Sequence, residues 1–293
     1  MENQKRLPSG EKLYKAFLYL VLGLLALTIL VPVGWVFLAS IKTDPEFYTN
    51  PWNLPVSFYW QNFVSAWNAA QMGQYLINSV MVTAMALGLL LVVALPAAYC
   101  LSRFRFRGRR LLNTCFMAGL FINVNYIVVP IFLMLRDGDA FLRGIFGQGF
   151  LLNNLFVLAV IYASTALPFT IYLLSGYFST LPHDYEEAAY LDGASHFKTM
   201  VQIMLPMAKP SIITVVLFNF LSFWNEYIIA LTICYQSSTL PVGLVNLMQK
   251  QNAPGTYGQL YAGLVMVMLP TLLLYICVQK NLTKGMTVGG LKG

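Results

Sequence analysis

Six long apolar stretches, separated by shorter polar segments, set the pattern of this chain. Lys, Arg, Asp and Glu are absent from all of them except the fifth, which is interrupted by Glu226. Each is long enough to cross about 30 Å of hydrocarbon as a helix. Membrane-spanning strands would instead alternate over about ten residues, a pattern that the sequence lacks. The chain is therefore predicted to be an all-α integral membrane protein with six transmembrane helices, at residues 16–41, 75–101, 111–135, 152–175, 211–233 and 260–279.

The composition agrees with this prediction and excludes other classes. Of the 293 residues, 58% are hydrophobic and 10% are charged, whereas about 25% are charged in an average soluble domain. The mean hydropathy is +0.66. These values exclude a soluble enzyme, a disordered chain and a collagen-like fibre. The four cysteines lie in apolar stretches without a CxxC pair, so we expect neither a disulfide framework nor a metal site.

Basic residues are concentrated on one side of the predicted topology. Six spans place both termini on that side, together with segments 102–110 and 176–209, and these four regions, with Lys280 counted at the C-terminal end, hold 14 of the 18 Lys and Arg residues. Because cytoplasmic loops are enriched in Lys and Arg, we expect cytoplasmic tails at 1–15 and 281–293 around a membrane domain at 16–280. The net charge of +7 is thus explained by membrane orientation, so membrane lipid, and not nucleic acid, is an expected partner.

One cytoplasmic connection, residues 176–209, has the pattern of ordered structure. Acidic residues suited to the positive end of a helix dipole precede Gly193, where the pattern is interrupted. An apolar stripe at i, i+3, i+4 and i+7 follows, so two short helices hinged near Gly193 are predicted. Such a hairpin could dock a partner or lie flat on the membrane, and the pattern leaves both open. The acidic residues are Asp184, Glu186 and Glu187, and the stripe is Phe197, Met200, Val201 and Met204.

The same connection contains a specific motif. Glu187-Ala188-Ala189 is followed by Gly193 and, after nine intervening residues, by Ile203-Met204-Leu205-Pro206. This series resembles the EAA loop (EAA…G…I-LP) of the transmembrane subunits of ABC importers. Residues 78–79, 223–226 and the ending 285–293 are similar to carbohydrate-uptake permeases of the maltose G type. The ending departs from that family's usual GLTAGAVKG at Met286, Val288, Gly290 and Leu291.

The resemblance implies a type I ABC importer permease, with a six-span permease domain, in the bacterial cytoplasmic (inner) membrane. Such a chain pairs with a second, homologous permease and receives its solute, here a sugar or oligosaccharide, from a solute-binding protein. Two ATP-binding cassette subunits bind ATP and Mg and hydrolyse the ATP. In agreement, the sequence contains no GxxxxGK[ST] phosphate-binding loop, so we expect neither an enzyme nor a cofactor bound by this chain.

The resemblance also implies roles within the loop. Glu187 would pair with a basic residue of the ATPase, Ala188 and Ala189 would allow close approach, and Gly193 would supply a bend that is cheap without a Cβ atom. The stripe at 197–204 would tie the loop to the permease body. The expected ATPase-coupling residues are Glu187, Ala188, Ala189, Gly193, Ile203, Leu205 and Pro206.

Polar residues within the spans are candidates for the translocation path. Glu226 is the single acidic residue in a predicted span, where a carboxylate is costly unless it has partners. On a continuous helix Ser222, Asn225 and Glu226 would share one side, while Pro130 is expected to kink the third span. Carboxylate, amide and aromatic groups suit a sugar, but a structural network between helices would use the same residues, and both interpretations stay open. The candidates are Asn123, Asn125, Tyr126, Asn219, Ser222, Trp224, Asn225, Glu226 and Tyr227, with Tyr162, Ser164 and Thr165 able to serve similarly.

Other functions are weighed against this one. The EAA signature also suits importers of glycerol phosphate, polyamines or peptides, although the lack of Lys and Arg in the spans favours a neutral substrate. A secondary transporter usually has more spans or inverted repeats, and no repeat is found. An intramembrane serine protease is disfavoured because adjacent Ser195 and His196 would point about 100° apart on a helix.

Overall fold

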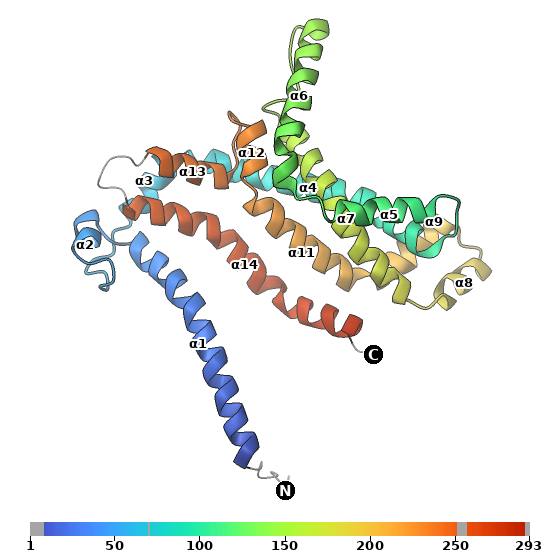
Figure 1. Cartoon of the computed structure of the whole chain (residues 1–293), viewed down its shortest axis with the longest axis horizontal. Helices are drawn as coiled ribbons and strands as arrows, with labels where there is room; N and C mark the ends of the chain where they lie inside the picture. The colour runs from blue at the N-terminus through green and yellow to red at the C-terminus, as the bar shows by residue number, and fades with distance from the viewer. Residues whose placement is uncertain (1–8, 70, 251–256, 291–293) are drawn as a thin grey trace. The chain divides into compact units, whose positions relative to one another are not determined.

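The computed structural model describes residues 9–69, 71–250 and 257–290, and over these ranges it consists of helices and turns without strands (Figure 1). The predicted all-α class is therefore confirmed. Residues 1–8 and 291–293 of the predicted tails lie outside the described residues. The chain forms two compact units, one of Met1–Ala70 with Leu247–Met266 and the other of Gln71–Asn246 with Val267–Gly293.

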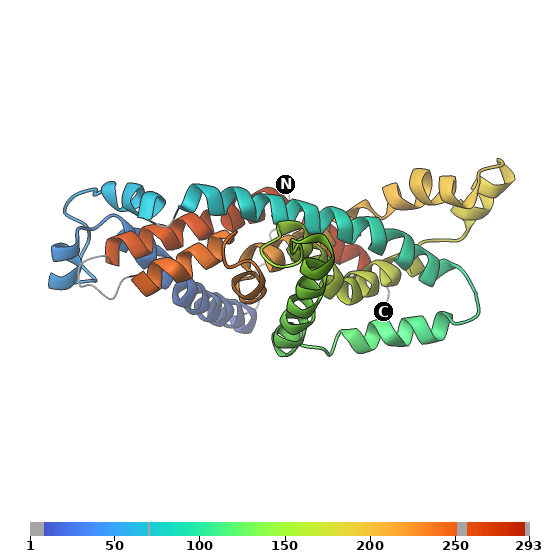
Figure 2. The ribbon, with the colours of Figure 1, turned by 90° about the horizontal axis from the view of Figure 1, so that it is seen from above.

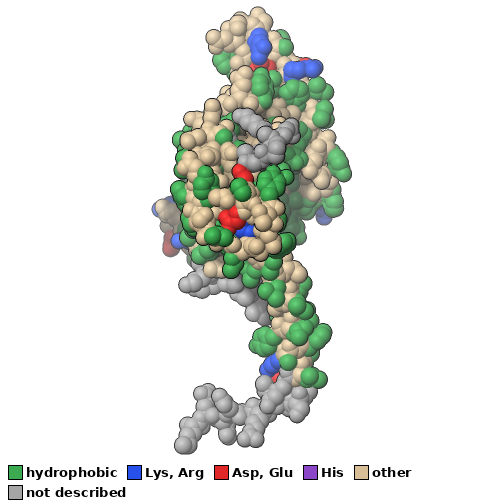
Figure 3. All heavy atoms as spheres, turned by 90° about the vertical axis from the view of Figure 1, so that its left-hand side faces the viewer, with side chains coloured by type: hydrophobic (Ala, Val, Ile, Leu, Met, Phe, Trp, Pro, Cys, Tyr) green, Lys and Arg blue, Asp and Glu red, His purple; other side chains and the backbone are tan. Residues whose placement is uncertain are grey.

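Several helices have the length and hydropathy of membrane spans. Four qualify individually, and the number reaches six if each of two bent helix pairs counts as one span. The four lie in α1 (Ser9–Ser40), α4 (Met72–Arg103), α7 (Leu155–Thr180) and α14 (Tyr257–Gly290). The bent pairs are α5 (Arg109–Gly119) with α6 (Val124–Phe146), and His196–Met207 with α11 (Lys209–Asn225). Figure 3 shows hydrophobic side chains interspersed with polar and charged ones on the face that it draws.

The first unit joins the end of α1 to the beginning of α14. Asn62, on α3 (Gln61–Ala69), donates from Nδ2 to the carbonyl oxygens of Ser40 at 2.9 Å and Lys42 at 2.7 Å. An aromatic cluster that includes α2 (Asp44–Thr49) completes the junction, with rings from Trp35, Phe47, Tyr257 and Tyr261. None of the most apolar part of α1 is buried in the described structure.

The second unit is built on the contact of α4 with α7, and α11 packs against both (Figures 1 and 2). Small side chains are fully buried in this core, among them Ala86, Ala94 and Ala98 of α4 and Ala159 of α7. Between helices in lipid, close packing of small residues replaces the hydrophobic driving force as the main source of association. The alanines therefore explain why these two helices form the core.

Side-chain hydrogen bonds hold α4 near both of its ends. At its beginning, Asn78 Nδ2 donates to the carbonyl oxygen of Ser238 at 3.0 Å, and Ser79 Oγ accepts from Leu240 N at 2.8 Å, where α13 (Leu240–Lys250) starts. At its other end, Tyr99 and Arg103 contact Glu186. A helix of 32 residues is about 48 Å long. The helix thus links two distant parts of the second unit.

The third predicted span is two helices rather than one helix kinked at Pro130. Gly119 ends α5 and Val124 begins α6, and their axes differ by 102°. The Asn123 side chain caps α6 by accepting from Asn125 N at 3.0 Å. Pro130 lies inside α6 without ending it. The prediction of a single helix over 111–135 was therefore wrong, because a capped break can lie within an uninterrupted apolar run.

The fifth predicted span, 211–233, is also divided. It consists of α11, which ends at Asn225, and of α12 (Ile228–Ile233). Glu226 between them is extended, with ψ of 128°, and its carboxylate accepts from Ile229 N at 2.8 Å and Ala230 N at 3.2 Å. The single acidic residue of the span thus precedes a new helix instead of continuing the first, and Ser222 and Glu226 share one cavity whereas Asn225 does not line it.

Candidate functional site

Two short helical segments form the connection at 176–209, as predicted. The first is α8 (Asp184–Leu191), and the second consists of α9 (His196–Thr199), the π-helix η1 (Met200–Met204) and α10 (Leu205–Met207). Gly193 stands between them with φ of +80°, in the left-handed region that favours glycine. Ser195 then caps α9 by accepting from Lys198 N at 3.3 Å. A glycine bend followed by a capping serine explains the hinge.

The three residues of the EAA triad do not face the same way. Glu187 and Ala188 are exposed, whereas Ala189 is buried. Successive residues of a helix are about 100° apart, so the buried Ala189 shares its side with Glu186, three residues earlier. The pair Glu187–Ala188 is therefore presented outward, and Glu186 and Ala189 face the permease body.

The apolar stripe behaves differently from the prediction. Met200 and Met204 are buried, but Phe197 is 72% exposed and Val201 41% exposed. From Met200 onward the segment is a π-helix, in which Leu205 N donates to the oxygen of Met200, five residues earlier, so the angular spacing of the side chains differs from that of the α-helix assumed in the prediction. Only the two methionines of the stripe are buried. Among the later motif residues, Ile203 and Leu205 are half-buried and Pro206 is exposed.

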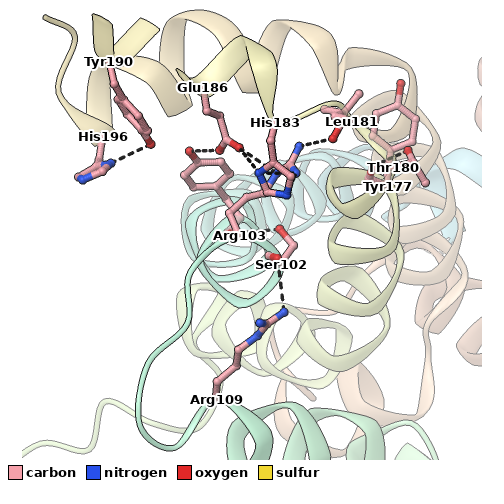
Figure 4. Close-up of polar contacts among 11 residues, drawn as sticks. Ser102, Arg103, Arg109, Tyr177, Thr180, Leu181, His183, Glu186, Tyr190 and His196 are labelled. Atoms are coloured by element: carbon pink, nitrogen blue, oxygen red, sulfur yellow. Dashed lines mark hydrogen bonds and ion pairs between the residues drawn. The ribbon is translucent and has the colours of Figure 1, made fainter. Parts of the chain in front are cut away.

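Glu186 is the centre of a polar cluster that the sequence analysis did not single out (Figure 4). Its Oε1 accepts from the Tyr99 hydroxyl at 2.6 Å, and its Oε2 lies 3.3 Å from Arg103 Nε and 3.3 Å from His183 Nδ1. Arg103 Nη2 donates to the Leu181 carbonyl oxygen at 2.7 Å. The side chains of Glu186 and Arg103 are only 7% and 3% exposed. We call Tyr99, Arg103, His183 and Glu186 the Glu186 cluster.

A second link joins α8 to α9. The Tyr190 hydroxyl lies 2.8 Å from His196 Nδ1, and the two rings meet edge to face. The His196 ring also meets Phe104, just beyond the end of α4. The hairpin is therefore held together internally, and both of its arms reach the end of α4.

A cavity of about 420 Å³ lies among α6, α7, α11 and α12. Of the residues proposed for the translocation path, it is lined by Asn125, Asn219, Ser222 and Glu226, together with Tyr162 and Thr165 of α7. The lining also contains three aromatic residues that were not among the candidates, Phe169 of α7 and Phe218 and Phe223 of α11. An aromatic residue in an apolar run looks the same in the sequence whether it lines a cavity or packs elsewhere, so no local signal identifies them.

The other path candidates lie elsewhere. Trp224 is buried, with its Nε1 donating to the Val267 carbonyl oxygen at 3.3 Å and its ring stacked on Phe220. Asn225 donates to the Leu221 carbonyl oxygen, four residues earlier, and Asn123 caps α6. Tyr126 and Tyr227 are exposed and do not line the cavity. Trp224 is therefore packed in the core, Asn123 and Asn225 bond to nearby backbone, and Tyr126 and Tyr227 are presented on the surface of this chain.

Glu226 has structural partners and lines the cavity at the same time. The Tyr162 hydroxyl donates to its Oε2 at 2.6 Å, while the carboxylate also caps α12. Deeper in the core, Asn219 Nδ2 donates to Thr170 Oγ1 at 3.0 Å. The cavity thus offers a carboxylate, amides, hydroxyls and aromatic rings, a set able to hydrogen-bond hydroxyl groups and to stack on apolar faces. None of its lining residues is Lys or Arg, and no group of three or more metal-ligating side chains occurs among the described residues.

Comparisons with known proteins agree with this architecture. The family model of the binding-protein-dependent transport system inner membrane component matches residues 90–288. The diacetylchitobiose uptake system permease NgcG of Streptomyces coelicolor is 35% identical, over 96% of this chain and 90% of its own length. The trehalose/maltose transport system permease MalG of Thermococcus litoralis is 30% identical, over 97% of this chain and 99% of its own length. A crystal structure of a bacterial ABC transporter involved in the import of the acidic polysaccharide alginate matches with a TM-score of 0.80 at 24% identity. The match covers 94% of this chain and 99% of the chain in that structure.

These matches confirm the predicted resemblance and the permease fold of type I ABC importers. They also confirm that the chain is a transport component and not an enzyme, since the family and the relatives are permeases. Together with its apolar helices, they make it a multi-pass integral membrane protein. The chain belongs to the family of binding-protein-dependent transport system inner membrane components.

Proposed function

We propose that this chain is one of two homologous permease subunits of an ATP-driven importer that moves a sugar or oligosaccharide across the bacterial cytoplasmic membrane. A solute-binding protein delivers the substrate from outside, and two ATPase subunits, which bind ATP and Mg, drive transport through the EAA loop. The observation that carries this proposal is the complete EAA signature of the connection at 176–209, in which Glu187 and Ala188 on α8 are exposed.

The coupling role rests on the shape of the connection. A short helix with an exposed carboxylate, followed by a glycine bend, offers a compact surface for a groove on another protein. The small Ala188 beside Glu187 permits close approach. The residues proposed to couple the chain to its ATPase remain Glu187, Ala188, Ala189 and Gly193, with Ile203, Leu205 and Pro206 supporting them.

The substrate class rests on the cavity and on the relatives. Relatives carry names for the uptake of diacetylchitobiose, galactooligosaccharides and trehalose or maltose. The cavity combines Glu226, Asn125 and Ser222 with aromatic rings, which suits a polyhydroxylated substrate. An anionic substrate is disfavoured because a carboxylate, and no cationic side chain, lines the cavity. The transport experiment described below compares this class with the alternative substrates, which are glycerol phosphate, polyamines and peptides.

The arrangement in the membrane follows from the charge distribution. We propose cytoplasmic tails at 1–15 and 281–293, a six-span permease domain at 16–280, and a cytoplasmic coupling loop at 176–209. The five arginines between Arg103 and Arg110 support this orientation under the positive-inside rule. They lie at the same end of α4 as the Glu186 cluster, so both cytoplasmic connections meet there.

A co-purification experiment tests the assembly. The chain is tagged at its N-terminus, expressed in its native membrane, purified in mild detergent and analysed by mass spectrometry. We expect a second permease with an EAA loop and a P-loop ATPase. Glu187→Ala should remove the ATPase while the second permease stays bound, whereas Asp184→Asn, an exposed carboxylate on the same helix, should retain both. Purification of the chain alone, with Glu187→Ala without effect, would contradict the proposal.

A transport experiment tests the substrate class. The purified complex with its solute-binding protein is placed in liposomes, and uptake of radiolabelled N,N′-diacetylchitobiose, maltose, glycerol 3-phosphate, spermidine and a tripeptide is compared with and without internal ATP. We expect ATP-dependent uptake of a neutral sugar. Uptake restricted to one of the three non-sugar substrates would overturn the assigned class while leaving the permease role intact.

A further inference from the structure

We propose that Glu186 and Arg103 are positioning residues that fix the coupling helix α8 to the end of α4, so that a movement imposed on α8 reaches the helices around the cavity. This inference rests on the proposed function, because it requires a partner that moves α8. It gives the carboxylate next to the EAA triad a role distinct from that of Glu187.

The two adjacent glutamates have opposite environments. Glu187 is exposed, whereas the side chain of Glu186 is almost completely buried and faces Arg103 and Tyr99. A buried carboxylate is unfavourable unless a charge and hydrogen bonds compensate its lost hydration. Both carboxylate oxygens of Glu186 have such partners, so the N-terminal turn of α8 is held in one position on the body.

Arg103 binds both sides of the turn that leads into α8. Its Nε lies 3.3 Å from Glu186 Oε2 as an ion pair without a hydrogen bond, while its Nη2 donates to the carbonyl oxygen of Leu181, the residue that follows α7. The guanidinium is a rigid plane whose edges can face two partners at fixed positions, whereas the ammonium of a lysine is a point charge on a flexible stem. Arg103 therefore joins three elements, α4, the end of α7 and α8, through one side chain (Figure 4).

Tyr99 lies one turn before Arg103 on the same side of α4. Its hydroxyl binds Glu186, and its ring meets Phe178 of α7 edge to face at 5.7 Å. The cluster is thus continuous with the contact between α4 and α7 on which the second unit is built. Through α7 that contact reaches Tyr162 and Thr165 at the cavity, which gives a contiguous physical path between the two sites.

The charge pairing is selective. The chain contains no Asp or Glu between Glu46 and Asp137, so the arginines after α4 have no acidic neighbour in their own segment. Among the described ion pairs, Arg103 is the arginine of this segment that meets a carboxylate. Arg105, Arg107 and Arg110 are exposed, and the half-buried Arg109 donates to backbone carbonyl oxygens. A general attraction between a basic loop and an acidic helix would not single out one arginine for a buried ion pair. The burial marks a defined contact.

The cluster is placed so that its loss would free α8 rather than unfold the body. The two arms of the hairpin are joined by Tyr190 and His196, so α8 and α9 move together. The Glu186 cluster attaches the N-terminal turn of α8 to α4 by polar side chains. Without the cluster, we expect the hairpin to rotate as one unit about the turn at Leu181, so that a movement of α8 does not reach α7.

The experiment measures ATP hydrolysis and the response of the cavity separately. The co-purified complex, with the four native cysteines replaced by serine and Ala166→Cys as a reporter in the cavity, is reconstituted in nanodiscs. Labelling by a water-soluble maleimide is measured with and without ATP and vanadate. We expect a clear ATP-dependent change in the wild-type background. Glu186→Gln or Arg103→Gln should reduce that change about tenfold while ATP hydrolysis continues, a size typical of coupling between sites.

The double variant Glu186→Gln/Arg103→Gln distinguishes positioning from a purely structural role. It contains no unpaired buried charge, so thermal stability should recover relative to either single variant. The labelling response should stay low, because the ion pair is still absent. If the response recovered together with the stability, or if Glu186→Gln responded like the wild type, the inference would be overturned. Arg105→Gln and Asp184→Asn, both exposed, serve as matched controls and should respond normally.

Two further results separate failure of this inference from failure of the proposed function. If no ATPase co-purifies with the wild-type chain, the proposed function itself fails. If Glu186→Gln does not assemble, Arg103→Lys takes its place, since it keeps the charge but not the second donor to Leu181. We expect a smaller loss of response for this variant, and a wild-type response would again overturn the inference.

Discussion

Two tyrosine–glutamate pairs occupy opposite functional regions of the second unit. Tyr99 donates to Glu186 beside the coupling helix, and Tyr162 donates to Glu226 beside the cavity, each at 2.6 Å. The surroundings differ. Glu186 is an internal residue of a helix and has a buried arginine, whereas Glu226 lies between two helices and caps the second. The same pair of side chains therefore attaches α8 to α4 in the first region, and in the second it lies at the break between α11 and α12.

The comparison shows what the charge on each glutamate is used for. The charge of Glu186 is met by a cation, so its main energetic partner is another side chain. Glu226 has no cation within ion-pair distance among the described residues, and its charge is met by backbone N–H groups and a hydroxyl. Removing a partner of Glu186 should therefore lower the free energy of unfolding more than removing a partner of Glu226.

The largest effect is expected from Arg103→Ala. It leaves the Glu186 carboxylate buried without its cation, and such a loss destabilises by about 3–5 kcal/mol. Thermal unfolding of the purified complex in detergent measures this change, with Arg105→Ala, on an exposed arginine, as the control. Equal melting temperatures for the two variants would show that the ion pair contributes nothing and that the contrast between the regions is wrong.

Glu226→Ala should cause the second-largest loss of stability. It removes the cap of α12 and leaves the Tyr162 hydroxyl without its acceptor, at a cost of about 2 kcal/mol. Glu226→Gln keeps an acceptor oxygen and should recover about half of that loss. The same unfolding measurement applies. A variant Glu226→Gln as unstable as Glu226→Ala would mean that the charge, and not the cap, is what matters.

A direct test of the comparison uses the two tyrosines. Tyr99→Phe and Tyr162→Phe each remove one hydrogen bond to a carboxylate, worth about 1.5 kcal/mol. The stability losses should be similar, but the functional losses should differ. Tyr99→Phe is expected to lower the ATP-dependent labelling response, and Tyr162→Phe to raise the KM for sugar uptake. Identical functional profiles for both variants would remove the distinction between a coupling region and a cavity region.

The smallest effect is expected at the Gly193 bend. Gly193→Ala places a Cβ atom on a residue with φ of +80°, which costs about 1 kcal/mol, although nothing lies within 4 Å of the new atom. The global melting temperature should hardly change. Hydrogen exchange in α8 should rise, because the bend is where the strain falls, while exchange in α7 stays as it was. Unchanged exchange in both helices would show that the glycine is not needed for the bend.

Part of this architecture could be predicted from the sequence because hydropathy and motif spacing act over short distances. The apolar runs that become α1, α4, α7 and α14 are long, uninterrupted and bounded by polar residues. The glycine bend between two short helices also follows from local chemistry. Each of these features is decided by residues close together in the chain.

The remaining features depend on contacts between distant residues. The break before α6 lies inside an apolar run, and only the capping Asn123 indicates it. The burial of Glu186 depends on Arg103, which lies far away in the sequence at the end of α4. Asp184, Glu186 and Glu187 are all acidic residues in the first turn of α8, so the sequence does not show which of them is buried. The π-helix at Met200–Met204 changes which side chains face the core without any marked change in composition. Local patterns could not separate these alternatives.

The length of α4 has a mechanical consequence. One continuous helix meets the Glu186 cluster at its last turn and the loop before α13 near its first. A rod of about 48 Å that tilts by about 5° displaces its far end by about 4 Å. Such a rod amplifies a small rotation at one membrane surface into a side-chain-sized displacement at the other. Under the proposed coupling role, the displacement at the far end depends on the number of residues in α4, so we expect a helix shortened by one turn to give a smaller displacement.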